Sequence, residues 1–273
     1  MQHHIYLFII RHIVFGILIF HHFSHTKALY GHNVRPAQQN EQSFVIKVMF
    51  IVPGANVSTD LICTGALVTR HDVISAEHCM QYVEMNNTKF LVGLTDSPQF
   101  RFYPNWWISY EQWEQHSDQR KGYLINDFCF IRLTSIVMDE FNTVTFSFYE
   151  QKKTSGKRVV VLGWGSLNNN TYPTTLQAAD LKVMSKKGCD RQISRVLGRR
   201  IQIQENILCT IGDPFTVLMD GDSGSPLLYR NKLIGVSTGI CPLVAENVLE
   251  DKVNLHINIY YYQEFLLEII STT

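Results

Sequence analysis

Short runs of β-branched and aromatic residues, separated by Gly, Pro, Asn and Asp, recur along most of this sequence. Runs of this kind are typical of β-strands bounded by turns. The clearest lie at residues 44–52, 61–68, 159–163 and 233–237. Many short strands with few helices are typical of β-barrels or of a β-sandwich, so the pattern predicts an all-β fold.

The end of the chain shows the only convincing helical period. Its apolar residues fall on one stripe at helical spacing: Tyr262, Phe265, Leu266, Ile269 and Ile270. We therefore expect one helix at the C-terminus. No internal repeat and no low-complexity linker precede it.

Length and composition allow a large core. The chain has 273 residues, of which 45% are hydrophobic, enough for one long β domain or two packed halves. The formal net charge is zero. Binding to nucleic acid or to an anionic membrane would need a stripe of basic residues, and the balanced charge does not indicate one. We therefore expect neither partner.

The first residues have the pattern of an export signal. Arg11 and several histidines precede the apolar run 13–20, and the small residues Ser24 and Ala28 follow it. The pattern predicts a cleaved signal peptide with a short propeptide within residues 1–27, and hence a secreted protein. A membrane anchor is the alternative, but a span needs about 20 apolar residues, and extension toward Ile5 would include Arg11.

Export agrees with the six cysteines and with three N-x-S/T sequons. Structural disulfides and N-linked sugars are both features of exported chains. The sequons begin at Asn56, Asn86 and Asn169, each in a polar segment between hydrophobic runs. We expect glycosylation there, with an unused sequon as the alternative at each position.

Three motifs carry candidate chemistry. Ser223 lies in Gly-Asp-Ser-Gly-Ser-Pro at 221–226, a turn that lifts a hydroxyl clear of the backbone. A serine attacks poorly unless a base takes its proton and a third group orients that base. His78 lies upstream in Ser-Ala-Glu-His-Cys, and Asp127 lies in Asn-Asp-Phe-Cys. The order His, Asp, Ser is that of chymotrypsin-type enzymes and differs from that of subtilisins and α/β-hydrolases.

With these motifs, residues 28–270 resemble the chymotrypsin-like serine endopeptidases of the trypsin fold. Gly163-Trp164-Gly165 resembles a further turn of that family. The resemblance implies two packed six-stranded antiparallel β-barrels followed by a C-terminal α-helix. The expected peptidase domain spans 28–273, with halves at roughly 28–140 and 141–260. Composition and periodicity alone would not give two barrels.

The resemblance also implies a role for each residue of the site. His78 would remove the Ser223 proton and then protonate the leaving amine, while Asp127 holds the imidazole in the required tautomer. Backbone N–H groups of Gly221 and Ser223 would bind the oxyanion. This chemistry needs no metal ion and no organic cofactor.

Asp222 is implied as the partner of a new amino terminus formed by proteolytic activation. Residues Ala28–Gly31 look like a degenerate form of the family's I-V-G-G start. Cleavage after Lys27 would free Ala28 and imply a trypsin-like activating protease. Cleavage after Ala28 would free Leu29 and imply signal peptidase. The first of these is favoured.

Four cysteines resemble two family disulfides, one joining Cys63 and Cys79 beside the catalytic histidine and one joining Cys189 and Cys209. Free buried thiols are the alternative for the second pair. Cys241 and Cys129 depart from the family pattern. Cys241 stands where the family has half of a bridge whose other position here is Met219, and it can pair between molecules. Cys129 is interpreted as a small buried hydrophobe rather than a reactive thiol.

The residues implied in substrate binding are Val217, Ser237, Thr238, Gly239 and Asn254. Val217 stands where enzymes that cut after Lys or Arg have an aspartate. Burying an unpaired cation costs several kcal/mol, so basic P1 residues should be rejected. We expect Leu, Met or Phe at P1 in a deep pocket, and Ala or Val if Val217 and Asn254 shorten it. Thr238 stands where the family has a tryptophan that floors the substrate groove.

The sequence thus predicts a secreted serine endopeptidase acting on proteins or peptides, with protein inhibitors and an activating protease as further partners. The alternative is a weakly active or inactive homologue that acts as a binding or regulatory protein. Thr238, the missing bridge and the irregular amino-terminal motif favour that alternative. An esterase would need the motif G-x-S-x-G, but Ser225 occupies its last position.

Overall fold

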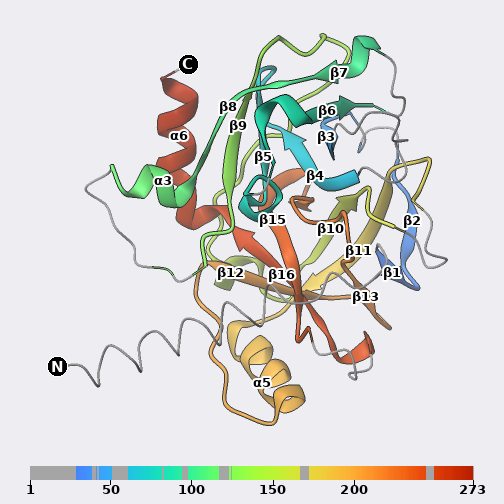
Figure 1. Ribbon diagram of the computed structural model, residues 1–273. Helices are drawn as coiled ribbons and strands as arrows, with labels where there is room; N and C mark the ends of the chain where they lie inside the picture. The colour runs from blue at the N-terminus through green and yellow to red at the C-terminus, as the bar shows by residue number, and fades with distance from the viewer. Residues whose placement is uncertain are drawn as a thin grey trace.

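The computed structural model describes residues 29–38, 41, 43–50, 61–81, 83–93, 98–116, 123, 125–166, 172–243 and 249–272. Most of these residues belong to two seven-stranded antiparallel sheets, one above the other in Figure 1. Each sheet curls into a barrel, and the active-site motifs lie in the segments between the two.

The first barrel has the strand order β7-β6-β3-β4-β5-β9-β8. Its strands are β3 (Val45–Phe50), β4 (Leu61–Leu67), β5 (Asp72–Ser75), β6 (Thr88–Val92), β7 (Arg101–Phe102), β8 (Pro104–Ser109) and β9 (Cys129–Leu133). Only Tyr103 separates β7 from β8. The two edges of the sheet therefore belong to one bent segment, and the sheet corresponds to six strands.

The second barrel has the order β10-β14-β15-β16-β12-β11-β2, and β10 also pairs with β11. Its strands are β10 (Arg158–Gly163), β11 (Gln177–Val183), β12 (Ile207–Ile211), β14 (Pro226–Tyr229), β15 (Lys232–Cys241), β16 (Val253–Asn258) and β2 (Val34–Pro36). The β10–β11 pairing closes a ring of six strands. The expected pair of six-stranded barrels is confirmed, and β2 is an added strand outside the ring.

The amino-terminal segment reaches the second barrel at two places. Strand β2 pairs with β11, and β1 (Tyr30–Gly31) pairs with β13 (Thr216–Val217) in a separate two-stranded sheet. The segment that precedes the first barrel is thus held by the second. The predicted boundary between the two halves near residue 140 stays a prediction.

The C-terminal helix α6 (Gln263–Ser271) follows the predicted stripe. Tyr262, Phe265 and Leu266 are buried, and Ile269 and Ile270 pack partly buried against the same core. Figure 1 shows α6 beside the short helix α3 (Tyr110–Glu114), and the rings of Tyr110 and Phe265 meet edge to face at 5.7 Å. The expected C-terminal helix is confirmed.

The described residues also form α5 (Lys186–Leu197), α3 and the short α4 (Gln151–Thr154), for which no position was predicted. Only Cys189 and Ile193 of α5 are buried, but its apolar residues Cys189, Ile193, Val196 and Leu197 recur at helical spacing, so this helix could have been predicted. Ser185 caps its start by accepting a hydrogen bond from the N–H of Gly188, and the left-handed Gly198 (φ 63°) ends it. The 3₁₀ turns are η1 (Glu77–Cys79), η2 (Met85–Asn87), η3 (Pro98–Phe100), η4 (Leu249–Asp251) and η5 (Ile259–Tyr262).

One hydrophobic cluster joins the two barrels. It includes Val48 and Ala66 of the first barrel, Leu162 and Val236 of the second, and Phe265 of α6, all fully buried. A close-packed core resists relative movement of the parts it joins. The segments between the barrels that carry the active-site motifs are therefore attached to a rigid core. Among the described residues, no helix is both long and apolar enough to traverse a bilayer.

Candidate active site

His78 and Asp127 are brought together by two neighbouring strands of the first barrel. His78 lies in η1, just after β5, and Asp127 lies just before β9. Strands β5 and β9 pair antiparallel, with Ser75 opposite Cys129, so the two segments start from the same end of the sheet. His78 Nδ1 lies 2.7 Å from Asp127 Oδ2, and the backbone N–H of His78 donates to Oδ1 over 2.8 Å.

The electrostatics of this pair favour an ionised carboxylate and a basic imidazole. Burial lowers the pKa of His78, but the Asp127 carboxylate, with a contribution from Glu77, outweighs it, so this pKa lies above its ordinary value. Burial raises the pKa of Asp127, but His78 and the Thr238 hydroxyl together lower it further, so the pKa of Asp127 lies below its ordinary value. The pair can therefore hold a proton on the imidazole.

Glu77 adds a titratable group next to this pair. Burial, followed by the nearby carboxylates of Glu111 and Asp127, raises the pKa of Glu77 to about 7. The residue before His78 thus carries a carboxyl group, that of Glu77, whose charge changes near neutral pH.

Thr238 contacts the carboxylate directly. Its hydroxyl donates a hydrogen bond to Asp127 Oδ2. The sequence suggested only that Thr238 replaces a groove-forming tryptophan, whereas here it helps to hold the carboxylate. Nothing in the local sequence links Thr238 to Asp127, because the two lie 111 positions apart.

Ser223 lies in a turn that packs against the first barrel. The carbonyl of Ser223 accepts a hydrogen bond from the N–H of Thr64 over 2.8 Å. The next residue, Gly224, has φ +83°, and a Cβ there would lie only 2.0 Å from the Thr64 carbonyl oxygen. Thr64 adjoins Cys63, whose disulfide to Cys79 reaches the residue after His78. The turn is thereby brought to the His78 region, and the Ser223 side chain makes no hydrogen bond within the described part of the chain.

Two backbone N–H groups of this turn make no hydrogen bond to any described residue, those of Gly221 and Ser223. Gly221 has φ +93°, a conformation that favours glycine. Its carbonyl accepts a hydrogen bond from the Thr64 hydroxyl over 2.8 Å, which fixes this peptide. Paired N–H groups of this kind can bind an oxyanion. Sequence reasoning missed Thr64, because its partners lie far along the chain.

Asp222 is fully buried and points away from the Ser223 side of the turn. Its carboxylate accepts hydrogen bonds from the N–H groups of Leu29 (2.8 Å), Met219 (3.1 Å) and Gly165 (3.1 Å). A Cβ on Gly163 would lie 2.0 Å from Asp222 Oδ1, which explains a glycine there. Burial raises the pKa of Asp222 to about 7 despite these three donors.

The nitrogen that reaches Asp222 is therefore that of Leu29. Of the two amino termini considered above, Ala28 and the preceding Lys27 lie outside the described residues. In an uncleaved chain the Leu29 nitrogen is a neutral amide, so it supplies a hydrogen bond but no positive charge.

In the segment expected to form the substrate pocket, a polar side chain is bonded to the backbone on both sides of Val217. Asn254, 1% exposed, accepts a hydrogen bond from the N–H of Leu218 and donates one to the carbonyl of Thr216, both over 2.8 Å. Val217, between them, is also buried. The Asn254 side chain thus fills the space between β16 and β13.

A buried histidine lies behind this segment. Ser237 is fully buried, with its hydroxyl 3.0 Å from His256 Nδ1, and the Thr210 hydroxyl lies 2.8 Å from His256 Nε2. Burial lowers the pKa of His256 to about 3, so the ring is neutral near pH 7. The Ser237 side chain therefore faces the protein interior, while Gly239 adopts φ 153° on the same strand.

The structure contains both expected disulfides, Cys63–Cys79 and Cys189–Cys209. Donor atoms of Cys63, His78 and Cys79 lie within 4.8 Å of one another, but the disulfide removes the thiolates that a metal ion would need. The chain's resemblance implies no metal at this position.

The other two cysteines are free. Cys129 is buried, and its thiol lies 3.5 Å from the carbonyl oxygen of Ala76. Burial raises the pKa of Cys129 well above its ordinary value, which agrees with an inert thiol. Burial likewise raises the pKa of the half-buried Cys241 to about 11.

Of the three sequons, only Asn86 lies within the described residues, where it is exposed on η2. An exposed turn leaves room for a sugar. Asn56 and Asn169 lie outside the described residues, as does the predicted export signal. Glycosylation and export therefore stay predictions.

Comparison with known proteins gives a consistent result. A family model described as Trypsin matches residues 29–265. A trypsin of Sarcophaga bullata is 26% identical over 191 residues, covering 68% of this chain and 71% of that protein. Kallikrein-4 of Homo sapiens is 28% identical over 188 residues, covering 68% of this chain and 70% of that protein.

A solved structure of neuropsin, a serine protease expressed in the limbic system of mouse brain, has a similar fold. The TM-score is 0.65 at 20% sequence identity, with coverage of 87% of this chain and 98% of that one. The family resemblance carried by the three motifs is thus confirmed. Since the family model covers most of its length, the chain belongs to the trypsin family of serine proteases.

Proposed function

We propose that this protein is an active serine endopeptidase in which His78, Asp127 and Ser223 form the catalytic triad. The observation that carries the proposal is the 2.7 Å contact between His78 Nδ1 and Asp127 Oδ2. It orients the imidazole so that Nε2 is the nitrogen left to act on a nucleophile. This alignment is the one that a general base acting on Ser223 requires.

The proposed reaction begins when His78 takes the hydroxyl proton of Ser223 as that oxygen attacks a peptide carbonyl. Asp127 stabilises the resulting imidazolium, which then protonates the departing amine. The unbonded N–H groups of Gly221 and Ser223 bind the oxyanion of the tetrahedral intermediate. Water then attacks the acyl-enzyme: His78 takes a proton from the water and gives it to the Ser223 oxygen as the acyl group leaves.

We further propose that the active form begins at Leu29. Cleavage after Ala28 would turn the Leu29 nitrogen, which lies 2.8 Å from Asp222 Oδ2, into an ammonium group. The buried carboxylate would then have a counter-charge, and the pair would hold the turn at 221–223. This register favours release by signal peptidase over the activating protease implied by cleavage after Lys27.

The primary specificity pocket is proposed to be shallow. Asn254 bridges β16 to the backbone on both sides of Val217, so little room is left for a long P1 side chain. Small apolar residues, Ala or Val, are therefore expected at P1 in preference to Leu, Met or Phe. Lys and Arg are expected to be rejected because no carboxylate accompanies Val217.

Active-site titration tests the catalytic proposal. A fluorophosphonate probe should label the secreted protein at Ser223 in a one-to-one ratio, and neither Ser223→Ala nor His78→Ala should be labelled. Each variant should lose nearly all peptide cleavage, and the double variant should lose no more, because the triad acts as a unit. A folded wild-type protein that takes up no probe would instead be the inactive homologue.

Two further measurements test the processing and the pocket. Mass analysis of the active protein should find Leu29 as its first residue, and a start at Ala28 would contradict the proposed register. A peptide library scanned at P1 should show preference for Ala and Val, and Asn254→Gly should shift that preference toward Leu and Phe. An unchanged profile in Asn254→Gly would show that Asn254 does not limit the pocket.

A further inference from the structure

Helix α5 and the segment after it concentrate positive charge that the proposed catalysis does not use. Six cations lie within residues 186–200: Lys186, Lys187, Arg191, Arg195, Arg199 and Arg200. All of them except Lys186 are exposed. The net charge of zero for the whole chain therefore conceals a local basic surface.

Most of these exposed cations have no acidic partner. Arg195 pairs with Asp251 over 2.6 Å. Within the described part of the chain, the other four exposed cations, Lys187, Arg191, Arg199 and Arg200, form no ion pair. Like charges kept together on a surface repel one another, so an arrangement of this kind is better suited to an anionic partner than to the isolated chain.

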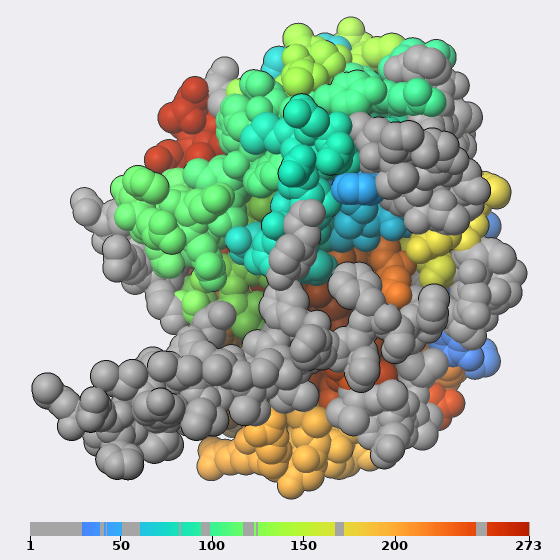
Figure 2. Space-filling model, viewed as in Figure 1, coloured from blue at the N-terminus to red at the C-terminus, as the bar shows by residue number. Residues whose placement is uncertain are grey.

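Three of the exposed cations lie along α5. Lys187, Arg191 and Arg195 recur at every fourth residue, which places them on one face of α5 at successive turns, roughly 6 Å apart. Arg199 and Arg200 continue beyond the end of the helix. We call these five residues the basic row. Figure 2 shows α5 as a ridge at the lower edge of the described surface.

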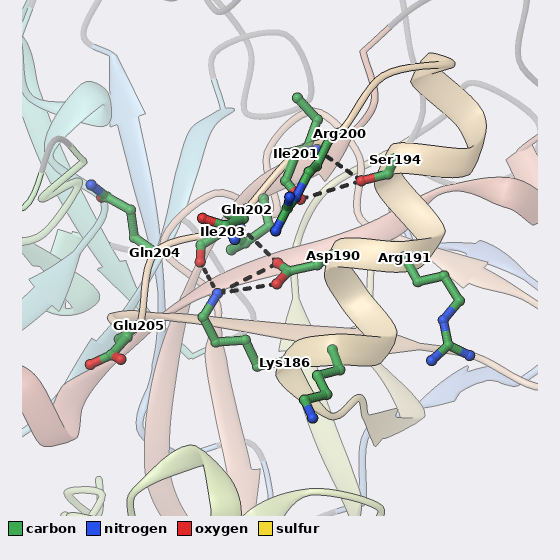
Figure 3. A pocket seen from close by; sticks show the side chains of 11 residues that line it. Lys186, Asp190, Arg191, Ser194, Arg200, Ile201, Gln202, Ile203, Gln204 and Glu205 are labelled. Atoms are coloured by element: carbon green, nitrogen blue, oxygen red, sulfur yellow. Dashed lines mark hydrogen bonds and ion pairs between the residues drawn. The ribbon is translucent and has the colours of Figure 1, made fainter.

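A groove of about 900 Å³ lies between α5 and the segment that returns from it, as Figure 3 shows. Side chains of the helix tie its two walls together. Ser194 Oγ accepts a hydrogen bond from the N–H of Ile201, and Asp190 Oδ1 accepts one from the N–H of Ile203, both over 2.8 Å. The Cys189–Cys209 disulfide also fixes α5 to β12. The groove is therefore already formed, which lowers the entropic cost of binding.

Lys186 belongs to the wall rather than to the ligand surface. Its ammonium lies 3.4 Å from Asp190 Oδ2 and also donates to the carbonyl of Ile203. In Figure 3 both side chains turn toward the returning segment, whereas Arg191 points away from them. The wall is thus held internally, and the basic row remains available.

The chemistry around the row restricts the partner. The described lining of the groove contains no aromatic side chain, so nucleic-acid bases would find no stacking surface there. The large apolar side chains exposed among the described residues are Met85, Tyr103, Ile136, Leu243 and Leu267, none of them on α5. A partner would therefore be recognised here by its charge rather than by apolar contacts. A linear polymer that presents charge alone fits this surface.

We propose that the basic row binds a sulfated polysaccharide. Guanidinium groups pair well with tetrahedral oxyanions through two parallel N–H donors, and three of the four unpaired cations are arginines. Sulfates repeated along a flexible glycan could meet successive turns of α5. This binding is independent of the triad and would persist in a catalytically dead protein.

The test measures binding of a heparin octasaccharide to the full-length Ser223→Ala protein by calorimetry at several salt concentrations. Each cation near a dense anionic surface contributes roughly fivefold to affinity, so Arg191→Gln, Arg199→Gln and Arg200→Gln together should weaken binding about 100-fold. The control combines Lys153→Gln, Arg158→Gln and Lys232→Gln, exposed cations of α4, β10 and β15 that form a second basic cluster outside α5. It should change the dissociation constant less than twofold.

Unfolding midpoints of both triple variants establish that they are folded. Affinity that falls as salt rises, with loss only in the α5 variant, supports the proposal. Equal loss in both variants, or no binding at low salt, would overturn it. Tighter binding of polyglutamate, oligothymidylate or phosphatidylserine vesicles than of heparin would assign the row to an acidic protein, a nucleic acid or a membrane instead.

Discussion

Thr64 connects the first barrel to the turn that carries the nucleophile. Its hydroxyl donates to the carbonyl of Gly221 over 2.8 Å and lies 3.2 Å from the N–H of Trp164. Thr64→Val would remove this hydroxyl at nearly constant shape. The Gly221–Asp222 peptide would keep one described hydrogen bond, from the Asp222 N–H to the carbonyl of Met219, so the turn that presents the N–H of Ser223 would be less firmly held. We expect kcat for peptide cleavage to fall about tenfold with KM nearly unchanged, because the oxyanion is bound only in the transition state. Thr64→Ser should retain most activity, and an equal loss in both variants would contradict this role.

Glu77 should influence the pH dependence of catalysis. Its carboxylate raises the pKa of His78, and an imidazole with a raised pKa needs a higher pH to become the neutral base. Glu77→Gln should therefore move the acidic limb of the kcat/KM profile to lower pH. Glu111→Gln should move it the other way, since Glu111 raises the pKa of Glu77 and its removal leaves Glu77 more fully ionised. Shifts of the same sign in the two variants would refute this coupling.

At the scale of elements, η5 connects the C-terminal helix to the segment that carries Asp127. The Tyr262 hydroxyl donates to Asn126 Oδ1 over 3.0 Å and accepts from Asn206 Nδ2 over 2.8 Å, and all three side chains are buried. Tyr262→Phe would leave two buried amides short of a partner, so unfolding free energy should fall by about 1–3 kcal/mol. Urea denaturation measures this.

Tyr260→Phe is the matched control for that variant. Its hydroxyl lies 3.3 Å from Glu150 Oε1 in a partly buried contact one turn away. Loss of this long, partly buried hydrogen bond should change the unfolding free energy by less than about 0.5 kcal/mol. A similar cost at both positions would mean that the hydroxyl of Tyr262 has no special part in holding the Asp127 segment.

The strands, the C-terminal helix and the motif residues could be predicted because each depends on a short stretch of sequence. The residues 159–163, for example, form a buried strand in any fold that covers them on both sides. Helix α5 could have been predicted too, because Cys189, Ile193, Val196 and Leu197 recur at helical spacing between Ser185 and Gly198. The contacts of Thr64 and Thr238 could not be predicted, because their partners meet them only when the two barrels have packed. Those of Asn254 could not either, because they join segments of the second barrel that lie 36 and 38 positions apart.

At the scale of the whole molecule, the buried Asp222 links processing to stability. In the uncleaved chain its pKa is raised to about 7, above the ordinary value of 3.8, so the folded state binds a proton more tightly than the unfolded state. The stability that this proton contributes is complete below about pH 4 and is lost as pH rises through 7. The loss should be on the order of a few kcal/mol, given about 1.4 kcal/mol per pKa unit.

Urea titrations of the unprocessed Ser223→Ala chain between pH 4 and 8 would measure this loss. Asp222→Asn should flatten the curve, because the amide cannot ionise. A chain that begins at Leu29 should also be flatter, since its ammonium group offsets the charge of Asp222. An unprocessed chain with no pH slope would argue against a buried, unpaired carboxylate.

Strands β1 and β2 belong to the beginning of the chain but pair with β13 and β11, which are made much later. During synthesis, the first barrel can therefore fold before the strands to which its leading segment docks have been made. The second barrel closes through β10 and β11 without needing β2. Contacts between such distant parts of a chain form slowly, so docking of the leading segment is expected to come last. Release of the leading segment would then be the first step of unfolding.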